Sequence, residues 1–350
     1  MTAPADPTTP PPPRELPNPL KPLHDAADAE LQNYEAIEVV ATFGEPQAEY
    51  AALHKACGLM DLAHRGVLEL TGKDRLPFLN NLVTNEVWSK QTKSGLAAGQ
   101  GAAAMLLLAN GKPVSVFNVI ERGDRTLLEM DARVVDPTRK ALDRYLFADQ
   151  VTMADRVGDL HELALLGPGA SAVLDAAVGS HVAELPPLGS AQVSLYGVDD
   201  VVVWRDDVTG SPGLHLLVPT DRVGHVWSQL VANLGGLVAH AKRPLRPVGW
   251  AAFNTCRVEA GRPLFGIDFD ASVLPGELDA DTFGRHVNVA KGCYVGQEIV
   301  ARMYARKQSA RLLVGLRMPD EALPMAGSAV YDDAGNQVGG ITSSTISPVQ

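Results

Sequence analysis

Segments with the alternating pattern of strands and segments with helical periodicity follow one another along this chain, without the strict strand–helix–strand rhythm of a parallel sheet. The clearest strands lie between Ala102 and Ala132, where three apolar runs are separated by Asn110-Gly111 and Gly123-Asp124. Both dipeptides are typical of tight turns between antiparallel strands. Because such strands are mixed with helices, the sequence predicts an α+β fold.

The remaining elements are predicted from periodicity and from the residues that begin and end helices. A helix from Ala48 should stop near Gly58, and Asp74 should cap the next helix. Further helices are expected over residues 137–145, 170–178, 221–234 and 250–260, and further strands over 66–72, 162–166, 193–205 and 214–218. From residue 312 onward the pattern is that of short strands with glycine turns.

The first 22 residues form a proline-rich segment. Consecutive prolines donate no backbone hydrogen bonds to a helix or a sheet, so we expect a disordered tail there. The whole chain of 350 residues is long enough to bury a large core and to form two or three subdomains.

Charge and cysteine content limit the class of protein. A net charge of −11 disfavours indiscriminate binding to nucleic acid or to an anionic membrane, so neither is expected as a direct partner. The chain has no apolar run long enough to span a bilayer and no secretory signal at its start. Three cysteines without close pairs suit a reducing compartment, and we therefore expect a cytoplasmic protein. The histidines and cysteines also lack the spacing of zinc or iron–sulfur ligands, so no metal site is expected.

The decapeptide Lys291–Val300 is the most specific motif in the chain. Cys293 follows Gly292, and Lys291 could lower the pKa of its thiol or hold an anion; the alternatives are a small turn residue and an ordinary solvated lysine. Gln297 and Glu298 could orient this loop or polarise a ligand, or they could simply begin a helix. We assign the catalytic role to Cys293 and Lys291.

This decapeptide resembles the signature of the YgfZ family of bacterial folate-binding proteins, which are related to a mitochondrial iron–sulfur assembly factor. Three other segments resemble the wider superfamily of the glycine-cleavage T-protein: Gly58–Val87, Arg257–Asp268 and Gly340–Pro348. The resemblance runs from about residue 36 to the end of the sequence. It implies two interleaved subdomains around a central cavity over residues 23–309, and a small C-terminal β-barrel over 310–350. Relatives usually add a strand after the last turn, so either the barrel is incomplete or the sequence is truncated.

Glu259 lies between apolar neighbours on the helix expected over residues 250–260, where a carboxylate needs a partner. The resemblance implies that this carboxylate binds the N–H groups of a pterin ring; the alternative is a salt bridge with a neighbouring arginine. Trp250 and Phe253 on the same helix could pack against the bound ring, or belong to the core. Together with Gln297 and Glu298, these residues are the expected folate-binding set.

The resemblance implies a folate-binding accessory protein with bound tetrahydrofolate or a derivative of it. Its expected partners are iron–sulfur client or assembly proteins, including enzymes that modify tRNA, and Cys293 would ligate a cluster transiently or act as a nucleophile. The alternative is a tetrahydrofolate-dependent aminomethyl or one-carbon transferase. Against that alternative, the segment Lys112–Val119 lacks the aspartate on which aminomethyl transfer relies in the T-protein. We therefore do not expect aminomethyltransferase activity.

Overall fold

A computed structural model describes residues 16–234, 245–307, 309–318 and 322–348. Residues 1–15 of the expected tail lie outside the described residues. Leu20 is fully buried and helix α1 (Lys21–Ala26) follows it, so the packed part of the chain begins before residue 22. A hairpin of β1 (Glu30–Tyr34) and β2 (Ile37–Thr42) comes next.

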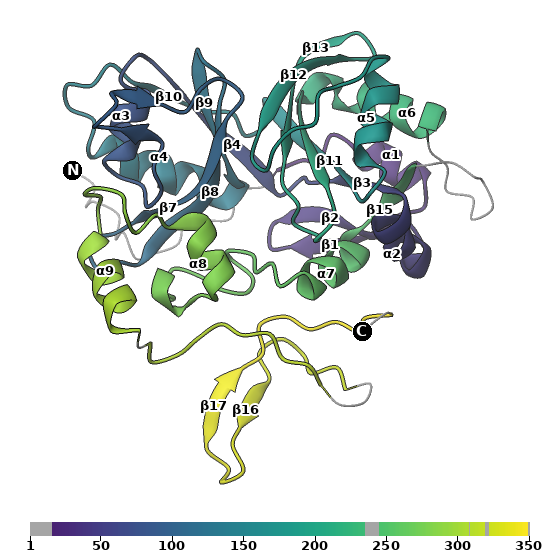
Figure 1. The fold of residues 1–350 in the computed structure, drawn as a ribbon. Helices are drawn as coiled ribbons and strands as arrows, with labels where there is room; N and C mark the ends of the chain where they lie inside the picture. Colours follow the sequence, from purple (N-terminus) through teal and green to yellow (C-terminus); the bar gives the residue numbers. More distant parts are fainter. Residues whose placement is uncertain (1–15, 235–244, 308, 319–321, 349–350) are drawn as a thin grey trace, which may run out of the picture.

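One antiparallel sheet contains five strands in the order β10-β4-β9-β8-β7 (Figure 1). The strands are β4 (Arg65–Thr71), β7 (Gly101–Leu107), β8 (Pro113–Glu121), β9 (Arg125–Asp131) and β10 (Thr152–Asp155). Helices α3 (Arg75–Asn80) and α4 (Val135–Asp143) contribute to one apolar core with this sheet, in which Leu79, Phe117 and Leu142 are buried. The three strands predicted between Ala102 and Ala132 are confirmed as β7, β8 and β9.

A second sheet contains six strands in the order β12-β13-β14-β11-β3-β15 (Figure 1). The strands are β3 (Cys57–Asp61), β11 (Leu160–Leu166), β12 (Ser190–Leu195), β13 (Val198–Arg205), β14 (Gly213–Pro219) and β15 (Leu245–Val248). Only the pairing of β15 with β3 is parallel. Side chains alternate between two faces, so Leu165 packs with α5 (Ala170–Val178) and α6 (Thr220–Leu234), whereas Ala164 packs with α2 (Pro46–Lys55) and α7 (Trp250–Glu259).

The chain passes between the two sheets at two neighbouring places. Strand β3 leads into β4 of the other sheet, and β10 leads into β11, which returns to the side of β3. Residues 62–64 and 156–159 therefore connect the two sheets. The expected α+β class is confirmed, and this crossing places the strands of both sheets around a common space.

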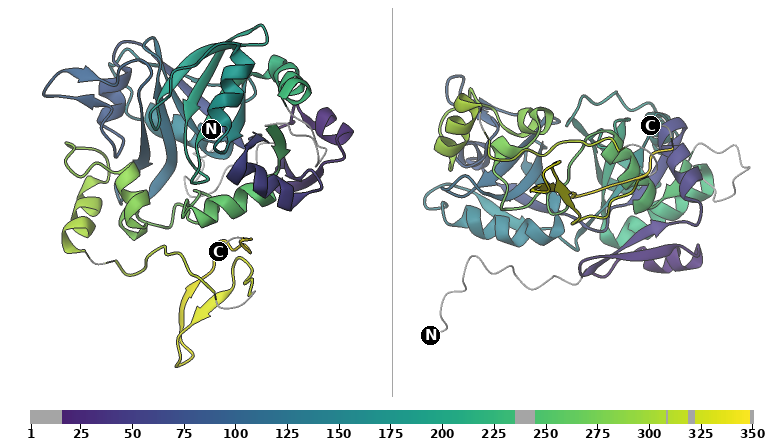
Figure 2. Two further views of the ribbon diagram at one scale, coloured as in Figure 1. Left: turned by 45° about the vertical axis from the view of Figure 1, so that its right-hand side comes forward. Right: turned by 90° about the horizontal axis from the view of Figure 1, so that it is seen from below.

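Residues after α7 pack across the first sheet and then leave the body of the molecule. Helices α8 (Ala280–His286) and α9 (Gln297–Arg306) lie beside the β7 side of the five-stranded sheet, and a hairpin of β16 (Ala329–Tyr331) and β17 (Gln337–Gly340) projects away from it (Figures 1 and 2). The described part of residues 310–350 forms this two-stranded pair and no closed sheet, so the expected β-barrel is not confirmed. The short elements are β5 (Trp88–Ser89), β6 (Ser94–Gly95) and the 3-10 turns η1 (Ala132–Val134) and η2 (Pro275–Glu277).

Two sequence-based boundaries are wrong. The segment 193–205, expected as one strand, is a hairpin of β12 and β13. The helix expected from Ala48 to about Gly58 ends at Lys55, and Cys57 begins the buried strand β3. Among the described residues, no helix has both the length and the apolar character that crossing a membrane requires.

Candidate functional site

A cavity of about 120 Å³ lies between the two sheets. Strands β4, β8 and β9 line it from one sheet and β11, β13 and β14 from the other, while α7, α8 and residues 262–269 close it. Its polar lining includes Arg65, Asn118, Glu129, Asp206, His215 and Arg285, and its aromatic lining includes Trp204, Phe253, Phe265 and Phe269. Buried polar groups of this kind need partners, and those partners define what the cavity can bind.

Glu129 is held on the side of the five-stranded sheet by two neighbouring strands. It lies opposite Asn118 in the register of β8 and β9, and Asn118 Nδ2 donates a hydrogen bond to Glu129 Oε2 at 2.9 Å. Arg65 on β4 forms an ion pair with the other carboxylate oxygen. Burial alone would raise the pKa of Glu129, but the Arg65 charge outweighs it and the pKa is lowered. Glu129 is therefore a buried carboxylate that stays ionised.

His215 is held on the side of the six-stranded sheet by Glu162. The ring of His215 lies opposite Trp204 in the register of β13 and β14, with 4.4 Å between ring centroids. Its Nδ1 lies 2.7 Å from Glu162 Oε1, whereas His215 Nε2 and Trp204 Nε1 have no hydrogen-bond partner among the described residues. One ring nitrogen is therefore fixed by a carboxylate and the other is left for a ligand.

The surroundings of Glu162 and His215 raise the pKa values of both groups. Burial and the nearby charge of Glu129 raise the pKa of Glu162 to about 7. Burial would lower the pKa of His215, but the hydrogen bond and charge of Glu162 offset this effect and the pKa is raised. By contrast, burial lowers the pKa of His64 and of His286 to about 4, so these two rings are neutral near physiological pH.

Asp206 and Arg285 form an ion pair in the wall of the cavity, and one carboxylate oxygen of Asp206 has no partner among the described residues. Asp206 Oδ2 lies 2.8 Å from Arg285 Nη2, and Asp206 Oδ1 is buried without a partner in the described chain. Phe253, Phe265 and Phe269 supply aromatic surface beside these groups. A planar, polar ring fits this combination, because its faces would contact aromatic side chains and its edge would find unpaired donors and acceptors.

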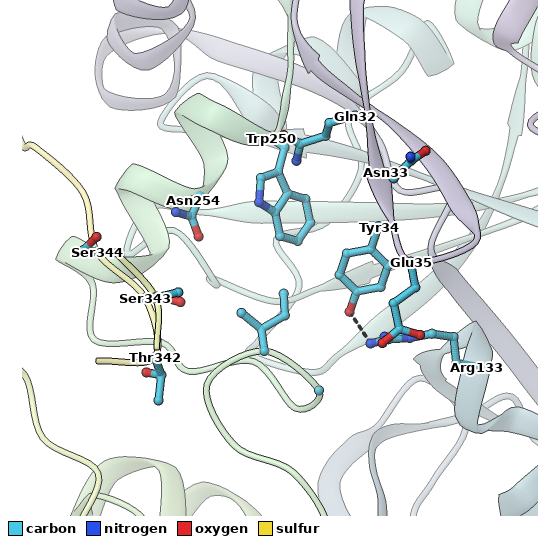
Figure 3. A pocket seen from close by; sticks show the side chains of 13 residues that line it. Gln32, Asn33, Tyr34, Glu35, Arg133, Trp250, Asn254, Thr342, Ser343 and Ser344 are labelled. Carbon is cyan, nitrogen blue, oxygen red and sulfur yellow. Dashed lines mark hydrogen bonds and ion pairs between the residues drawn. The ribbon is translucent and has the colours of Figure 1, made fainter. Parts of the chain in front are cut away.

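A second, open hollow of about 500 Å³ lies between the β1–β2 hairpin, α7 and the C-terminal segment. Figure 3 shows Tyr34, Arg133 and Trp250 around it, with Thr342 and Ser343 on the opposite side. Its charged groups are already paired: Arg133 bonds Tyr34, Asp131 and Glu35 at 2.6–2.7 Å. The charged groups of this hollow are therefore engaged with one another, whereas the cavity contains buried polar atoms that have no partner among the described residues.

The residues expected to bind folate are dispersed by the structure. Phe253 lines the cavity, and Trp250 lines the open hollow instead. Glu259 lines neither, because its carboxylate contacts Tyr50 Oη and His54 Nε2. Gln297 is the first residue of α9, and Glu298 forms an exposed ion pair with Arg302 at 2.7 Å. The roles of these residues in binding stay predictions.

The cysteine loop lies apart from the cavity lining. Cys293 is exposed, whereas Lys291 is buried and its Nζ donates to the carbonyl of Val83 while lying 5.2 Å from the centre of the Tyr294 ring. Burial lowers the pKa of Lys291 to about 7. It also raises the pKa of the Cys57 and Cys256 thiols to about 12. The catalytic roles assigned to Cys293 and Lys291 remain predictions.

The polar groups of the cavity were not predicted from the sequence as site residues. Glu162 and His215 were included in predicted strands, but a charged or titratable residue inside an apolar strand is itself a signal, because such a group needs a partner. Glu129 carries the same signal within the strand Arg125–Asp131. That these residues converge could not be read from the sequence, since they come from strands of two different sheets.

Comparisons with known proteins agree on the family. Residues 20–287 match the GCVT N-terminal domain. The aminomethyltransferase of Bacillus licheniformis is 28% identical over 333 residues, covering 94% of this chain and 86% of the relative, and that of Shouchella clausii is 29% identical over 335 residues, covering 95% and 86%. The crystal structure of glycine cleavage system aminomethyltransferase T from Bartonella henselae shares the fold, with a TM-score of 0.79, 22% identity and coverage of 93% of this chain and 84% of that one.

These findings correct the function expected from the decapeptide. The relatives are named aminomethyltransferase, so the expectation of an accessory protein for iron–sulfur assembly in client enzymes, including those that modify tRNA, is wrong, and the expected iron–sulfur partners are not supported. Membership of the YgfZ family is likewise not confirmed. What the match over residues 20–287 does establish is that the chain belongs to the GCVT family, the superfamily of the glycine-cleavage T-protein and aminomethyltransferases.

Proposed function

We propose that the protein is a tetrahydrofolate-dependent one-carbon transferase that takes its one-carbon unit from an amine-bearing donor. Relatives named aminomethyltransferase support the reaction class, since they align with 94–95% of the chain. The observation that carries the proposal is the His215–Glu162 pair in the wall of the cavity, with His215 Nε2 unpartnered among the described residues.

The polar groups of the cavity suit the ring end of a folate. A pterin ring presents N–H donors and nitrogen or carbonyl acceptors along its edge. Asp206 Oδ1 can accept from such a donor, and Trp204 Nε1 can donate to such an acceptor. The volume of about 120 Å³ is small. Pockets that enclose a whole ligand usually hold roughly 300–1,000 Å³. We propose that the cavity takes the ring end only, and that the rest of the folate extends outward.

The His215–Glu162 pair is suited to moving a proton. Bound tetrahydrofolate would supply the nitrogen that accepts the one-carbon unit. The amine that departs from the donor needs a proton, and His215 can hold one at Nε2 because Glu162 occupies Nδ1. Its raised pKa keeps that proton available closer to neutral pH. Glu162 would act by orienting the ring and fixing its protonation, as carboxylates do beside catalytic histidines.

A carboxylate is present in the cavity although Lys112–Val119 contains no acid. Glu129 lies on β9 directly opposite Asn118 of β8, and it remains ionised beside Arg65. A positively charged amine in the cavity would be attracted by this carboxylate. The missing aspartate therefore does not by itself exclude transfer from an amine.

Calorimetric titration with tetrahydrofolate tests the binding site. Trp204→Phe keeps an aromatic ring but removes the Nε1–H donor, so the affinity should fall about tenfold. Glu259→Gln discriminates between two assignments: its affinity should stay unchanged if the cavity binds the ring, and should fall if Glu259 is the pterin ligand that the sequence resemblance implied. Absence of saturable binding to the unmodified protein would overturn the proposal.

Turnover tests the reaction. The assay would follow transfer of the one-carbon unit from an aminomethyl-loaded carrier protein, or from a methylated amine, to tetrahydrofolate. His215→Asn keeps an N–H group toward Glu162 but removes Nε2, so kcat should fall by about 10²–10⁴ while the dissociation constant for tetrahydrofolate changes little. If the unmodified protein binds tetrahydrofolate yet shows no turnover above the uncatalysed rate with either donor, it is not this transferase.

A further inference from the structure

A group of three metal-ligating side chains lies outside the cavity, where α2 packs against α7. His54 is in the last turn of α2, and Cys256 and Glu259 are three residues apart on α7. One donor atom from each residue lies within 4.8 Å of the donor atoms of the other two. The closest approaches are 3.1 Å between His54 Nε2 and Glu259 Oε2, and 3.5 Å between His54 Nε2 and Cys256 Sγ.

This geometry differs from that of a cysteine–histidine–acid catalytic triad. In a triad the nucleophile and the acid occupy opposite ring nitrogens, so that a proton can pass on one side while the acid orients the other. Here both Cys256 and Glu259 approach the same nitrogen, Nε2 of His54. A single ring nitrogen has one proton or one lone pair and cannot serve both partners in that way. Three donors that converge on one point are instead arranged as ligands around a cation.

A second layer of contacts supports the three donors. Tyr50 Oη donates a hydrogen bond to Glu259 Oε1 at 2.8 Å, which leaves Oε2 directed toward His54. The Tyr50 ring also packs on the His54 ring, with 4.4 Å between centroids. Partners of this kind orient metal ligands in protein sites.

Burial and charge define the kind of ion. Cys256 is 1% exposed and the Glu259 side chain 7%, whereas the His54 side chain is 33% exposed, so among these three residues His54 is the most accessible to solvent. A thiolate and a carboxylate together balance the charge of one divalent ion. Thiolate and imidazole ligands favour zinc-like ions over Mg²⁺ or Ca²⁺, which prefer oxygen.

We propose that His54, Cys256 and Glu259 bind one divalent transition-metal ion of the zinc class, with a fourth position open to water on the exposed side. Three protein ligands with one open position are the arrangement of catalytic and of exchangeable zinc sites. Ligand spacing along the sequence did not reveal the site, because His54 and Glu259 are separated by 205 positions.

The test uses the full-length protein, treated with a chelator, dialysed and then titrated with Co²⁺ as a spectroscopic probe for zinc. We expect one equivalent to bind with the near-ultraviolet charge-transfer band of a cobalt–thiolate bond, and Zn²⁺ to displace it stoichiometrically. Cys256→Ser should abolish the band. Tyr50→Phe should keep the band and weaken binding by about 10- to 100-fold. Cys293→Ser, which alters the exposed cysteine, is the matched control and should leave the band and the stoichiometry of metal binding unchanged.

Absence of the band in the unmodified protein, persistence of the band in Cys256→Ser, or its loss in Cys293→Ser would overturn the proposal. Circular dichroism and the thermal midpoint of each variant show whether it is folded. If Cys256→Ser does not fold, His54→Gln replaces a partly exposed ligand and provides the same test by calorimetry with Zn²⁺. Affinity equal to that of the unmodified protein in this variant would also overturn the proposal.

Discussion

Replacing Glu162 by glutamine tests the electrostatics of the cavity through the pH dependence of folding. Glu162 is buried, and its pKa is raised from 4.5 to about 7 in the folded chain. Between these values the folded protein keeps a proton that the unfolded chain has lost. The stability gained from the protonated carboxyl is therefore fully present below pH 4.5 and is lost as the pH rises through about 7.

The size of this loss follows from the same shift. One pH unit of separation corresponds to about 1.4 kcal/mol, so the change from 4.5 to about 7 corresponds to about 3 kcal/mol of unfolding free energy. His215 contributes with the same sign, because its pKa is also raised and its stabilisation is lost as the pH rises. The lowered pKa values of His64 and His286 act in the opposite direction, but they are common to both proteins and cancel in the difference.

Urea unfolding of the unmodified protein and of Glu162→Gln, between about pH 5 and about pH 8, measures the effect. Glutamine cannot ionise, so the unfolding free energy of the variant should rise by about 3 kcal/mol relative to that of the unmodified protein as the pH increases across this range. Glu298→Gln is the matched control, because the Glu298 side chain is 82% exposed and its loss should leave the pH profile unchanged. Parallel profiles for Glu162→Gln and the unmodified protein would refute the reasoning.

Three further outcomes are expected. Arg65→Met leaves the buried carboxylate of Glu129 without its cation, so the unfolding free energy measured in urea should fall by about 3–5 kcal/mol. An unchanged urea midpoint would contradict the pairing. Iodoacetamide should label exposed Cys293 before the two buried thiols, as peptide mass mapping would show; simultaneous labelling would contradict the burial. Burial of the charged Lys291 ammonium destabilises the folded protein and lowers the pKa of Lys291 to about 7. This destabilisation decreases as the pH rises above about 7, so the unmodified protein should gain stability relative to Lys291→Met. Parallel unfolding curves would count against the buried ammonium.

Local signals predicted much of the fold. The turns at Asn110-Gly111 and Gly123-Asp124 separate three strands in the sequence and in the structure, because a tight turn is encoded by its own residues. The hairpin within 193–205 was missed because its turn, at Tyr196 and Gly197, interrupts a continuous run of strand-forming residues. Pairing of β3 with β11 and β15 depends on residues about 100 or more positions apart, which periodicity does not encode.

The candidate site was less predictable than the fold. Trp250 and Phe253 are three residues apart, so they lie about 60° from each other around a helix, and we expected both beside one ligand. That angle is enough to direct Phe253 into the cavity and Trp250 toward the open hollow. Glu259 needed a partner, as its apolar neighbours indicated, but the partners are Tyr50 and His54 on another helix.

Helix α7 connects the two proposed sites without merging them. Phe253 contacts the cavity, while Cys256 and Glu259 meet His54 of α2. Between these positions Arg257 is buried and donates to Asp268 at 2.6 Å, and so anchors residues 262–269, which close the cavity. A bound metal would tie α7 to α2 but would occupy none of the cavity, so its removal should leave the groups that contact the folate ring in place. The cobalt–thiolate band and the tetrahydrofolate titration therefore report on different residues, and either proposal can fail while the other stands.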